Sequence, residues 1–196
     1  MAVSPPTDTP PTDVAPAASP LIGLPPVHDR NARLLILGSF PGVASLAARA
    51  YYAHPRNQFW PILGALLEEP LAALPYADRV ARVRSRGVAI WDVVDRCLRP
   101  GSLDASIREA VANDFTALLE RSPRLAAVAF NGRRAARSAP WFAERGLATF
   151  ALPSTSPAHA GLSFERKLAE WRVLEAVLRP DQPAASPQRS APVASP

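Results

Sequence analysis

The stretch Leu34-Leu35-Ile36-Leu37-Gly38-Ser39-Phe40-Pro41-Gly42 decides the fold of this chain. An apolar run ends abruptly in a turn that holds two glycines and a proline. A continuous apolar run of this kind is typical of a strand covered on both faces, as in a parallel sheet. Open α/β sheets bind their ligands in the crevice at the carboxyl ends of such strands. We therefore expect a binding site directly after Leu37.

Three later apolar runs have the same character, and helical patterns separate them. The predicted strands cover residues 33–37, 87–91, 125–130 and 147–152. The predicted helices cover residues 57–67, 76–86, 106–120, 133–145 and 163–178, with breaks inside the third and fourth. This alternation predicts an α/β protein, a three-layer α/β/α fold around a central, mostly parallel four-stranded sheet with right-handed crossovers.

Both ends of the chain are rich in proline, alanine, serine and threonine. Such segments bury too little apolar surface to offset the entropy of ordering them. We therefore expect residues 1–27 and 180–196 to be disordered tails. Residues 28–179 then form one domain, long enough to bury about two thirds of its unfolded surface in a single core.

The predicted domain is basic. Residues 28–179 contain 21 Lys and Arg against 14 Asp and Glu, a net charge of +7. This excess suits a polyanion such as nucleic acid. A GC-rich genome, which encodes arginine throughout its proteins, explains the same composition equally well. The charge supports a nucleic-acid partner without proving one.

The residue inventory excludes several classes of protein. Cys97 is the only cysteine, which rules out a disulfide within the chain and a cysteine-ligated iron–sulfur cluster. The three histidines are too scattered to suggest a metal site. No apolar run has the length of a membrane span, and the first residues do not resemble a secretory signal. We expect a monomeric cytoplasmic protein with no metal or organic cofactor.

The turns that follow the four predicted strands share a polar or Gly/Pro/Ser-rich composition. They cover residues 38–42, 92–95, 131–134 and 153–160. In a parallel sheet these turns converge on one edge. Each turn alone would be unremarkable, but their coincidence indicates a functional site at this edge.

A second informative segment is Tyr51-Tyr52-Ala53-His54-Pro55-Arg56-Asn57-Gln58-Phe59-Trp60. It offers rings for stacking, amides for hydrogen bonding and cations for phosphate, which are the groups that a flipped nucleobase needs. We expect Phe59 and Trp60 to lie in the core. Asn57 stands near the start of a predicted helix, where its side chain either caps the helix or serves the chemistry.

Taken together, four ordered motifs resemble the uracil-DNA glycosylase superfamily. They are residues 38–42, residues 52–60, Phe130-Asn131-Gly132 and residues 152–157. The deoxyinosine (hypoxanthine) DNA glycosylase branch is most similar, followed by the mismatch-specific uracil/thymine DNA glycosylases. The resemblance covers the whole predicted domain. It implies a monofunctional base-excision repair enzyme that hydrolyses the N-glycosidic bond of deaminated bases in double- or single-stranded DNA, with a preference for hypoxanthine.

Two departures from the superfamily pattern shape this expectation. Phe40 stands where most members have an Asp or Asn before the proline, and Leu152 stands where a His often stabilises departing uracil. Efficient uracil excision is therefore not expected. The resemblance to the deoxyinosine branch implies instead that Asn57 is the catalytic residue and holds the attacking water.

The resemblance also implies binding residues. Tyr52 would stack on the extruded base and Asp92 would read its hydrogen-bonding edge, while the turn at Gly38, Ser39 and Phe40 would contact the base. Asp92 alternatively caps the following helix. The implied DNA-binding residues are His54, Arg56, Asn131, Arg133, Ser154, Thr155, Ser156 and His159. His159 is alternatively a merely exposed side chain.

Two other functions are left open by the sequence. Apolar Phe40 and Leu152 stand where relatives have polar residues, which also favours a catalytically weak module that binds lesion DNA. A small-molecule hydrolase built on the same sheet is the third alternative.

Overall fold

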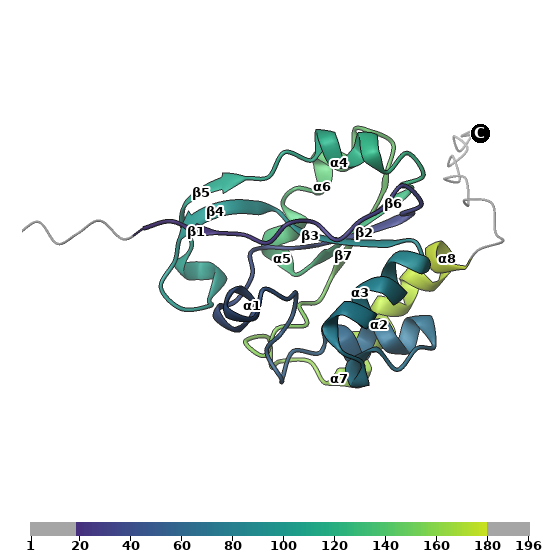
Figure 1. The fold of residues 1–196 in the computed structure, drawn as a ribbon, viewed down its shortest axis with the longest axis horizontal. Coiled ribbons are helices and arrows are strands. Elements are labelled where there is room, and N and C mark those ends of the chain that lie inside the picture. Colours follow the sequence, from purple (N-terminus) through teal and green to yellow (C-terminus); the bar gives the residue numbers. More distant parts are fainter. Residues whose placement is uncertain (1–18, 180–196) are drawn as a thin grey trace, which may run out of the picture.

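The computed structural model describes residues 19–179 of the chain. Its centre is a sheet of four strands, β2 (Leu34–Gly38), β3 (Val88–Asp92), β6 (Ala127–Asn131) and β7 (Ala148–Leu152). The strand order is β3-β2-β6-β7, and every neighbouring pair is parallel (Figure 1). The predicted parallel four-stranded sheet is confirmed.

Strand β2 lies inside the sheet, and all five of its residues are buried. Its alternating side chains enter two separate cores: Leu34 and Ile36 pack on one face, and Leu35 and Leu37 on the other. Strand β7 is an edge strand, and its alanines at positions 148 and 151 are exposed. The expectation that all four strands are covered on both faces is therefore wrong for β7.

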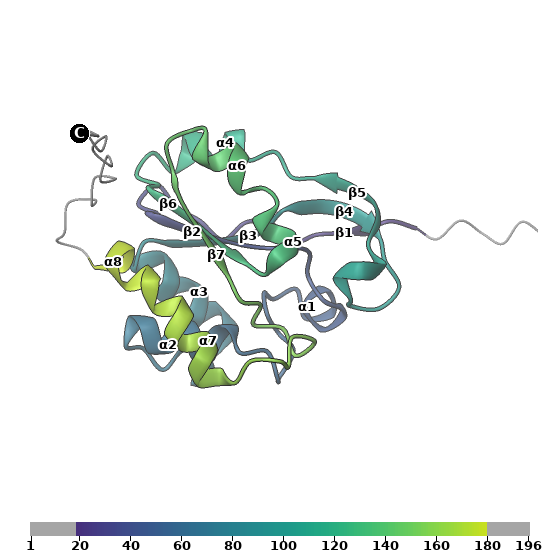
Figure 2. The same ribbon diagram turned by 180° about the vertical axis from the view of Figure 1, so that it is seen from behind.

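Helices cover both faces of the sheet (Figure 1 and Figure 2). One layer holds α2 (Phe59–Leu67), α3 (Tyr76–Ser85), α7 (Phe164–Trp171) and α8 (Glu175–Leu178). The opposite layer holds α4 (Thr116–Arg121), α5 (Arg133–Ala136) and α6 (Ala139–Ala143). Helix α1 (Val43–Ala48) comes directly after β2 in the chain. The three-layer α/β/α architecture is confirmed. None of the helices in the described part of the chain is both long and apolar enough to cross a membrane.

Short 3-10 turns complete the helical layers. They are η1 (Leu71–Ala73), η2 (Asp104–Ser106) and η3 (Arg172–Leu174). The last of these separates α7 from α8, so the predicted final helix has a tighter turn in its middle. The predicted break between residues 133 and 145 is also present, since α5 and α6 are two short helices.

A small antiparallel sheet extends beyond β3. It consists of β1 (Leu21–Ile22), β4 (Val94–Leu98) and β5 (Arg108–Ala112), in the order β1-β4-β5. The first half of the predicted helix over residues 106–120 is therefore wrong, and only its second half is helical, as α4. Local helical propensity is a weak preference that pairing with another strand overrides. All five β5 residues are exposed because β5 is an edge strand.

The ordered domain begins earlier than the sequence predicts. Besides strand β1, the backbone N–H of Gly23 donates to Asp95 O at 2.7 Å, and Val27 exchanges two backbone hydrogen bonds with Ile90. Val27 is also buried in the core. Assigning residues 19–27 to a disordered tail is thus wrong, because strand pairing absorbs a proline-rich segment that composition alone marks as unstructured. The other predicted tail residues, 1–18 and 180–196, lie outside the described residues.

Candidate active site

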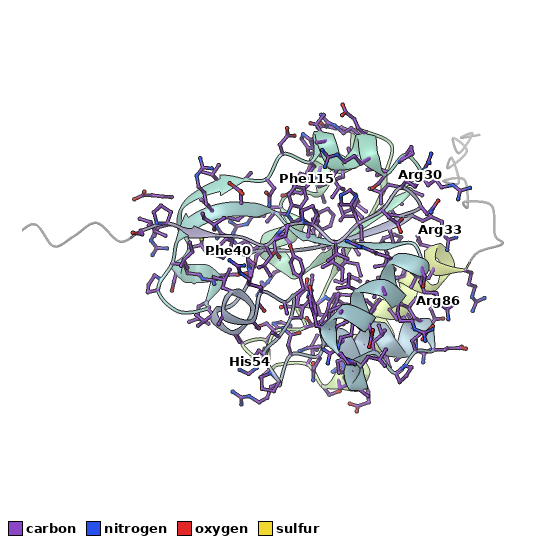
Figure 3. All side chains as sticks on the ribbon, viewed as in Figure 1. Arg30, Arg33, Phe40, His54, Arg86 and Phe115 are labelled. Atoms are coloured by element: carbon purple, nitrogen blue, oxygen red, sulfur yellow. The ribbon has the colours of Figure 1, made fainter. Side chains whose placement is uncertain are left out.

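A pocket of about 730 Å³ lies at the edge where the four parallel strands end. The turns after β2, β6 and β7 contribute to its walls together with Asp92 at the end of β3, so the pocket lies at the edge that the alternation of strands and helices predicts. Figure 3 shows Phe40 and His54 toward this end of the molecule, whereas Arg30 and Arg33 lie at the opposite end. The residues that line the pocket are 38–45, Tyr51, Tyr52, His54, Asn57, Asp92, 102–105, 131–134 and 154–159.

The turn after β2 brings the backbone close to other site groups. A Cβ atom on Gly38 would overlap the Asp92 carboxyl and would lie 3.1 Å from Tyr52 Oη, so only glycine fits this position. The backbone N–H groups of Ser39 and Phe40 donate to no other atom of the described residues. They have no acceptor in the described part of the chain, and both residues line the pocket.

Phe40 lines the pocket with a buried aromatic ring. Its ring is buried, and the Arg99 guanidinium lies over it at 4.8 Å from the ring centre. One Arg99 nitrogen also donates to Pro41 O at 2.5 Å. The buried Arg99 side chain thus holds the turn from behind, and Phe40 offers the pocket an apolar wall.

Tyr52 forms an aromatic platform beside the pocket. Its ring stacks on Phe59 with centres 3.7 Å apart and planes inclined by 17°. Its backbone has a φ of +56°, a left-handed conformation that is uncommon for an aromatic residue. Neighbouring bonds fix this geometry: Ala53 N–H donates to Ser45 Oγ at 3.2 Å, and Trp60 Nε1–H donates to Tyr51 O at 3.0 Å. Burial raises the pKa of Tyr52, so its hydroxyl is uncharged at neutral pH.

Asn57 bonds to the start of α2 and also lines the pocket. Its Oδ1 accepts the backbone N–H of Phe59, the first residue of α2, at 3.0 Å, whereas the N-cap residue is Gln58, whose side chain makes no cap bond. The side chain also lines the pocket, and its Nδ2 group donates to no other residue in the described part of the chain. A carbonyl oxygen has two lone pairs, so Oδ1 keeps one for a ligand or a water molecule. The bond to Phe59 therefore orients the carboxamide and leaves the Nδ2 group and one Oδ1 lone pair free to bind a ligand.

Asp92 is the last residue of β3, and it is only 3% exposed. Strand β4 follows it, so the alternative that Asp92 caps a helix is wrong. Its Oδ2 has no hydrogen-bond partner among the described residues. Burial raises the pKa of Asp92 to about 7, with a further increase from the charge of Asp104 and an opposing effect from Arg99.

The loop after β7 is attached to the fold at several points. Thr155 and Asn131 exchange two hydrogen bonds of 2.9 Å, and both residues are buried. Trp171 Nε1–H donates to Pro153 O at 3.0 Å, and Lys167 Nζ donates to His159 O at 2.8 Å. The structure thus turns the side chains of Asn131 and Thr155 inward, toward each other.

The other predicted DNA-binding residues lie around the pocket mouth. Arg56 is exposed and lies outside the pocket lining, and its backbone N–H donates to His54 Nδ1 at 3.1 Å. Arg133 is exposed at the start of α5. Three half-buried residues, Ser154, Ser156 and His159, line the pocket from the loop after β7.

One wall of the pocket is not anticipated by the sequence analysis. Residues 102–105 cross beside the β2 turn, where Ser39 Oγ donates to Asp104 Oδ1 at 2.6 Å and Val43 N–H donates to Ser102 Oγ at 2.9 Å. The Pro100-Gly101-Ser102 sequence is a turn signal that points to such a loop. Lys167 is also missed, since nothing in a helical pattern marks a buried lysine. Within residues 19–179, no three His, Cys, Asp or Glu side chains gather into a site that could hold a metal ion.

The fold and the pocket together define a class of α/β/α protein. At the carboxyl edge of its parallel sheet this chain carries the stacked Tyr52 ring, the Asn57 carboxamide and the buried Asp92 carboxyl group. The sequence model of the Uracil DNA glycosylase superfamily matches residues 25–177, and the chain belongs to this family. The resemblance seen in the sequence motifs is confirmed.

Proteins similar to this chain include two from Methanosarcina species. Hypoxanthine DNA glycosylase of Methanosarcina acetivorans is 37% identical over 157 residues, which cover 80% of this chain and 97% of that protein. Hypoxanthine DNA glycosylase of Methanosarcina barkeri is 36% identical over 137 residues, covering 70% and 87%. A solution NMR structure of a Methanosarcina acetivorans protein described as a uracil DNA glycosylase superposes with a TM-score of 0.74 at 34% identity. It matches 82% of this chain and 99% of that one.

Proposed function

We propose that this protein is a monofunctional DNA glycosylase that removes hypoxanthine from DNA containing deoxyinosine. The observation that carries the proposal is the pocket at the strand ends, which is lined by Tyr52, Asn57 and Asp92. The similarity to two hypoxanthine DNA glycosylases supports the choice of base. The reaction is hydrolysis of the N-glycosidic bond between C1′ of the sugar and the base.

In this proposal the base enters the pocket by leaving the DNA stack. Extruding a weakly paired, deaminated base costs only a few kcal/mol, which favours lesions over normal bases. Stacking on the Tyr52 ring returns about 1–3 kcal/mol of that cost. The free N–H groups of Ser39 and Phe40 are donors for O6 of hypoxanthine. Buried Phe59 keeps the Tyr52 ring in place from behind.

The proposed chemical step depends on Asn57. Cleavage passes through a sugar cation with oxocarbenium character, which the DNA phosphates help to stabilise. Asn57 Oδ1 holds the attacking water through the lone pair that the bond to Phe59 leaves free. A carboxamide is not a useful base near neutral pH, so its contribution is orientation of the nucleophile.

We further propose that the DNA backbone runs across the pocket mouth. Six residues would contact it, namely His54, Arg56, Arg133, Ser154, Ser156 and His159. Asn131 and Thr155 would act indirectly, by holding the loop that enters the minor groove. We also propose that the enzyme acts as a monomer in the cytoplasm.

A uracil/thymine preference is the main competitor, and two buried residues argue against it. The Phe40 ring is buried beneath the Arg99 guanidinium, and Leu152 belongs to the core. Neither side chain can hydrogen-bond to a departing uracil oxygen.

A base-release panel tests the proposal. Duplex and single-stranded oligonucleotides carrying hypoxanthine, uracil, thymine mispaired with guanine, or xanthine are incubated with excess protein, and free bases are quantified. The proposal predicts that hypoxanthine is released fastest and that free deoxyinosine is not hydrolysed. Faster release of uracil would favour the mismatch-type enzyme. Binding of the lesion duplex without release of any base would favour the non-catalytic binding module.

A further inference from the structure

Asp92 is a buried carboxyl group that the proposed water-activation step does not use. It ends β3 inside the pocket, beside the position where a side chain on Gly38 would lie. Its Oδ2 accepts no hydrogen bond from any described residue. Buried polar atoms are nearly always paired, so an unpaired one in a pocket indicates a partner on the ligand.

The groups around Asp92 do not neutralise a negative charge. Arg99, which follows β4, is the nearby cation, but it lies over Phe40 and makes no ion pair with Asp92 among the described residues. Asp104, from the wall at residues 102–105, adds a like charge. The hydroxyls of Tyr51 and Tyr52 are neutral because burial raises the pKa of each phenol.

An ionised Asp92 would therefore be a buried charge with no ion-paired partner among the described residues, which is strongly unfavourable. The neutral carboxylic acid avoids that cost and has one O–H donor. The pKa of about 7, caused mainly by burial, agrees with this geometric argument.

We propose that Asp92 acts as the general acid of the reaction and transfers its carboxyl proton to N7 of the extruded hypoxanthine. This inference rests on the proposed function, and it assigns Asp92 a catalytic role beyond reading the base. Hypoxanthine presents two neighbouring acceptors, O6 and N7. The free N–H groups of Ser39 and Phe40 serve O6, and the Asp92 O–H serves N7. Adenine carries a donor at its position 6, so this set of donors rejects it.

The proton balance of the step is complete. As the C1′–N9 bond breaks, its electron pair moves into the purine, and the proton from Asp92 binds N7. Hypoxanthine then leaves as a neutral base and Asp92 becomes a carboxylate. Water adds its oxygen to C1′ and loses a proton to solvent, and Asp92 recovers a proton from solvent after the base departs.

Single-turnover pH profiles test the inference. Wild type and Asp92→Asn are compared on deoxyinosine duplex between about pH 5.5 and 9, with DNA binding measured in parallel. The wild-type rate should fall about tenfold per pH unit once Asp92 ionises. Asp92→Asn should be about 100-fold slower or more at acidic pH, with a flat profile and nearly unchanged affinity. A variant that keeps the wild-type pH profile would overturn the inference.

A modified substrate gives a second test that needs no mutation. A duplex with 7-deaza-2′-deoxyinosine lacks the acceptor nitrogen but keeps O6. Wild type should bind this duplex and cleave it as slowly as Asp92→Asn cleaves deoxyinosine, and Asp92→Asn should lose nothing further on it. Cleavage of the 7-deaza duplex at the deoxyinosine rate would refute proton transfer to N7. If wild type releases no hypoxanthine at any pH, the proposed function falls and this inference falls with it.

Discussion

Asn131 and Thr155 hold each other through two hydrogen bonds of 2.9 Å, one from the Asn131 side-chain amide to Thr155 Oγ1 and one from the Thr155 backbone N–H to Asn131 Oδ1. Asn131 ends β6, and Thr155 lies in the loop after β7. The pair therefore joins two turns of the pocket through polar groups that are both buried. Because these two bonds join protein groups directly, the loop is organised before DNA arrives.

Replacing Thr155 by valine should loosen this loop. The substitution keeps the side-chain shape but leaves the Asn131 Nδ2 group buried without its acceptor, which costs about 1–3 kcal/mol of folding stability. We expect a lower melting temperature and a higher KM for lesion DNA, with a smaller change in kcat. Thr149→Val is the matched control, because Thr149 is a half-buried β7 residue with no side-chain hydrogen bond among the described residues. Equal melting temperatures for the two variants would contradict the role of the pair.

Arg133 should contribute to DNA affinity through phosphate neutralisation. Its side chain is exposed at the pocket mouth, so Arg133→Gln should reduce the slope of log affinity against log salt by about 0.9 on duplex DNA. Arg124→Gln removes the same charge from an exposed site that precedes β6, at the opposite edge of the sheet. Its salt slope should match that of wild type. If Arg124→Gln reduced the slope and Arg133→Gln did not, the DNA would bind at the amino-terminal ends of the strands, which would contradict this placement.

Asp92 should also make folding stability depend on pH. Its pKa is about 7 in the folded protein against an ordinary value of 3.8, so the folded state binds this proton more tightly than the unfolded chain. The stability that Asp92 contributes is complete below its unfolded pKa and is lost as the pH rises toward 7. Asp92→Asn does not titrate and should exceed wild type in stability at about pH 8 by up to roughly 4 kcal/mol. Chemical denaturation at several pH values checks this, and a difference that does not grow with pH would contradict it.

The sequence predicts the central sheet well because local pattern and burial agree there. The apolar run that ends at Leu37 is long enough to identify a buried strand, and β2 is indeed fully buried. The end of this apolar run also marks the start of the turn at Gly38. A side chain at this position would overlap the Asp92 carboxyl, so glycine is required there. The pocket therefore lies where the alternation of strands and helices predicts it.

Strand pairing is what the local sequence pattern does not reveal. Residues 108–112 have the composition of a helix, yet they form strand β5 because β4 provides an edge to pair with. Residues 21–27 are ordered by contacts with β3 and β4, and a local window contains neither strand. The inward direction of the Thr155 side chain is hidden for the same reason, since its partner lies 24 residues away.

The central claim is that a carboxamide at position 57 orients the water that releases the base. The Asn57 side chain accepts a hydrogen bond from the Phe59 N–H at the start of α2. Asn57→Ala removes this bond and therefore also weakens the helix by about 1 kcal/mol. Ser163→Ala is the matched control, because it removes the cap of α7, where Ser163 Oγ accepts the Arg166 N–H, without touching the pocket lining.

The most direct measurement is the single-turnover rate of hypoxanthine release from deoxyinosine duplex by wild type, Asn57→Ala, Asn57→Asp and Ser163→Ala. We predict that Asn57→Ala is slower by about 100-fold or more while still binding the duplex, because the nucleophile loses its orientation. Asn57→Asp, which keeps the acceptor oxygen, should retain a rate well above that of Asn57→Ala, and Ser163→Ala should match wild type. Release of hypoxanthine by Asn57→Ala at the wild-type rate would contradict the account.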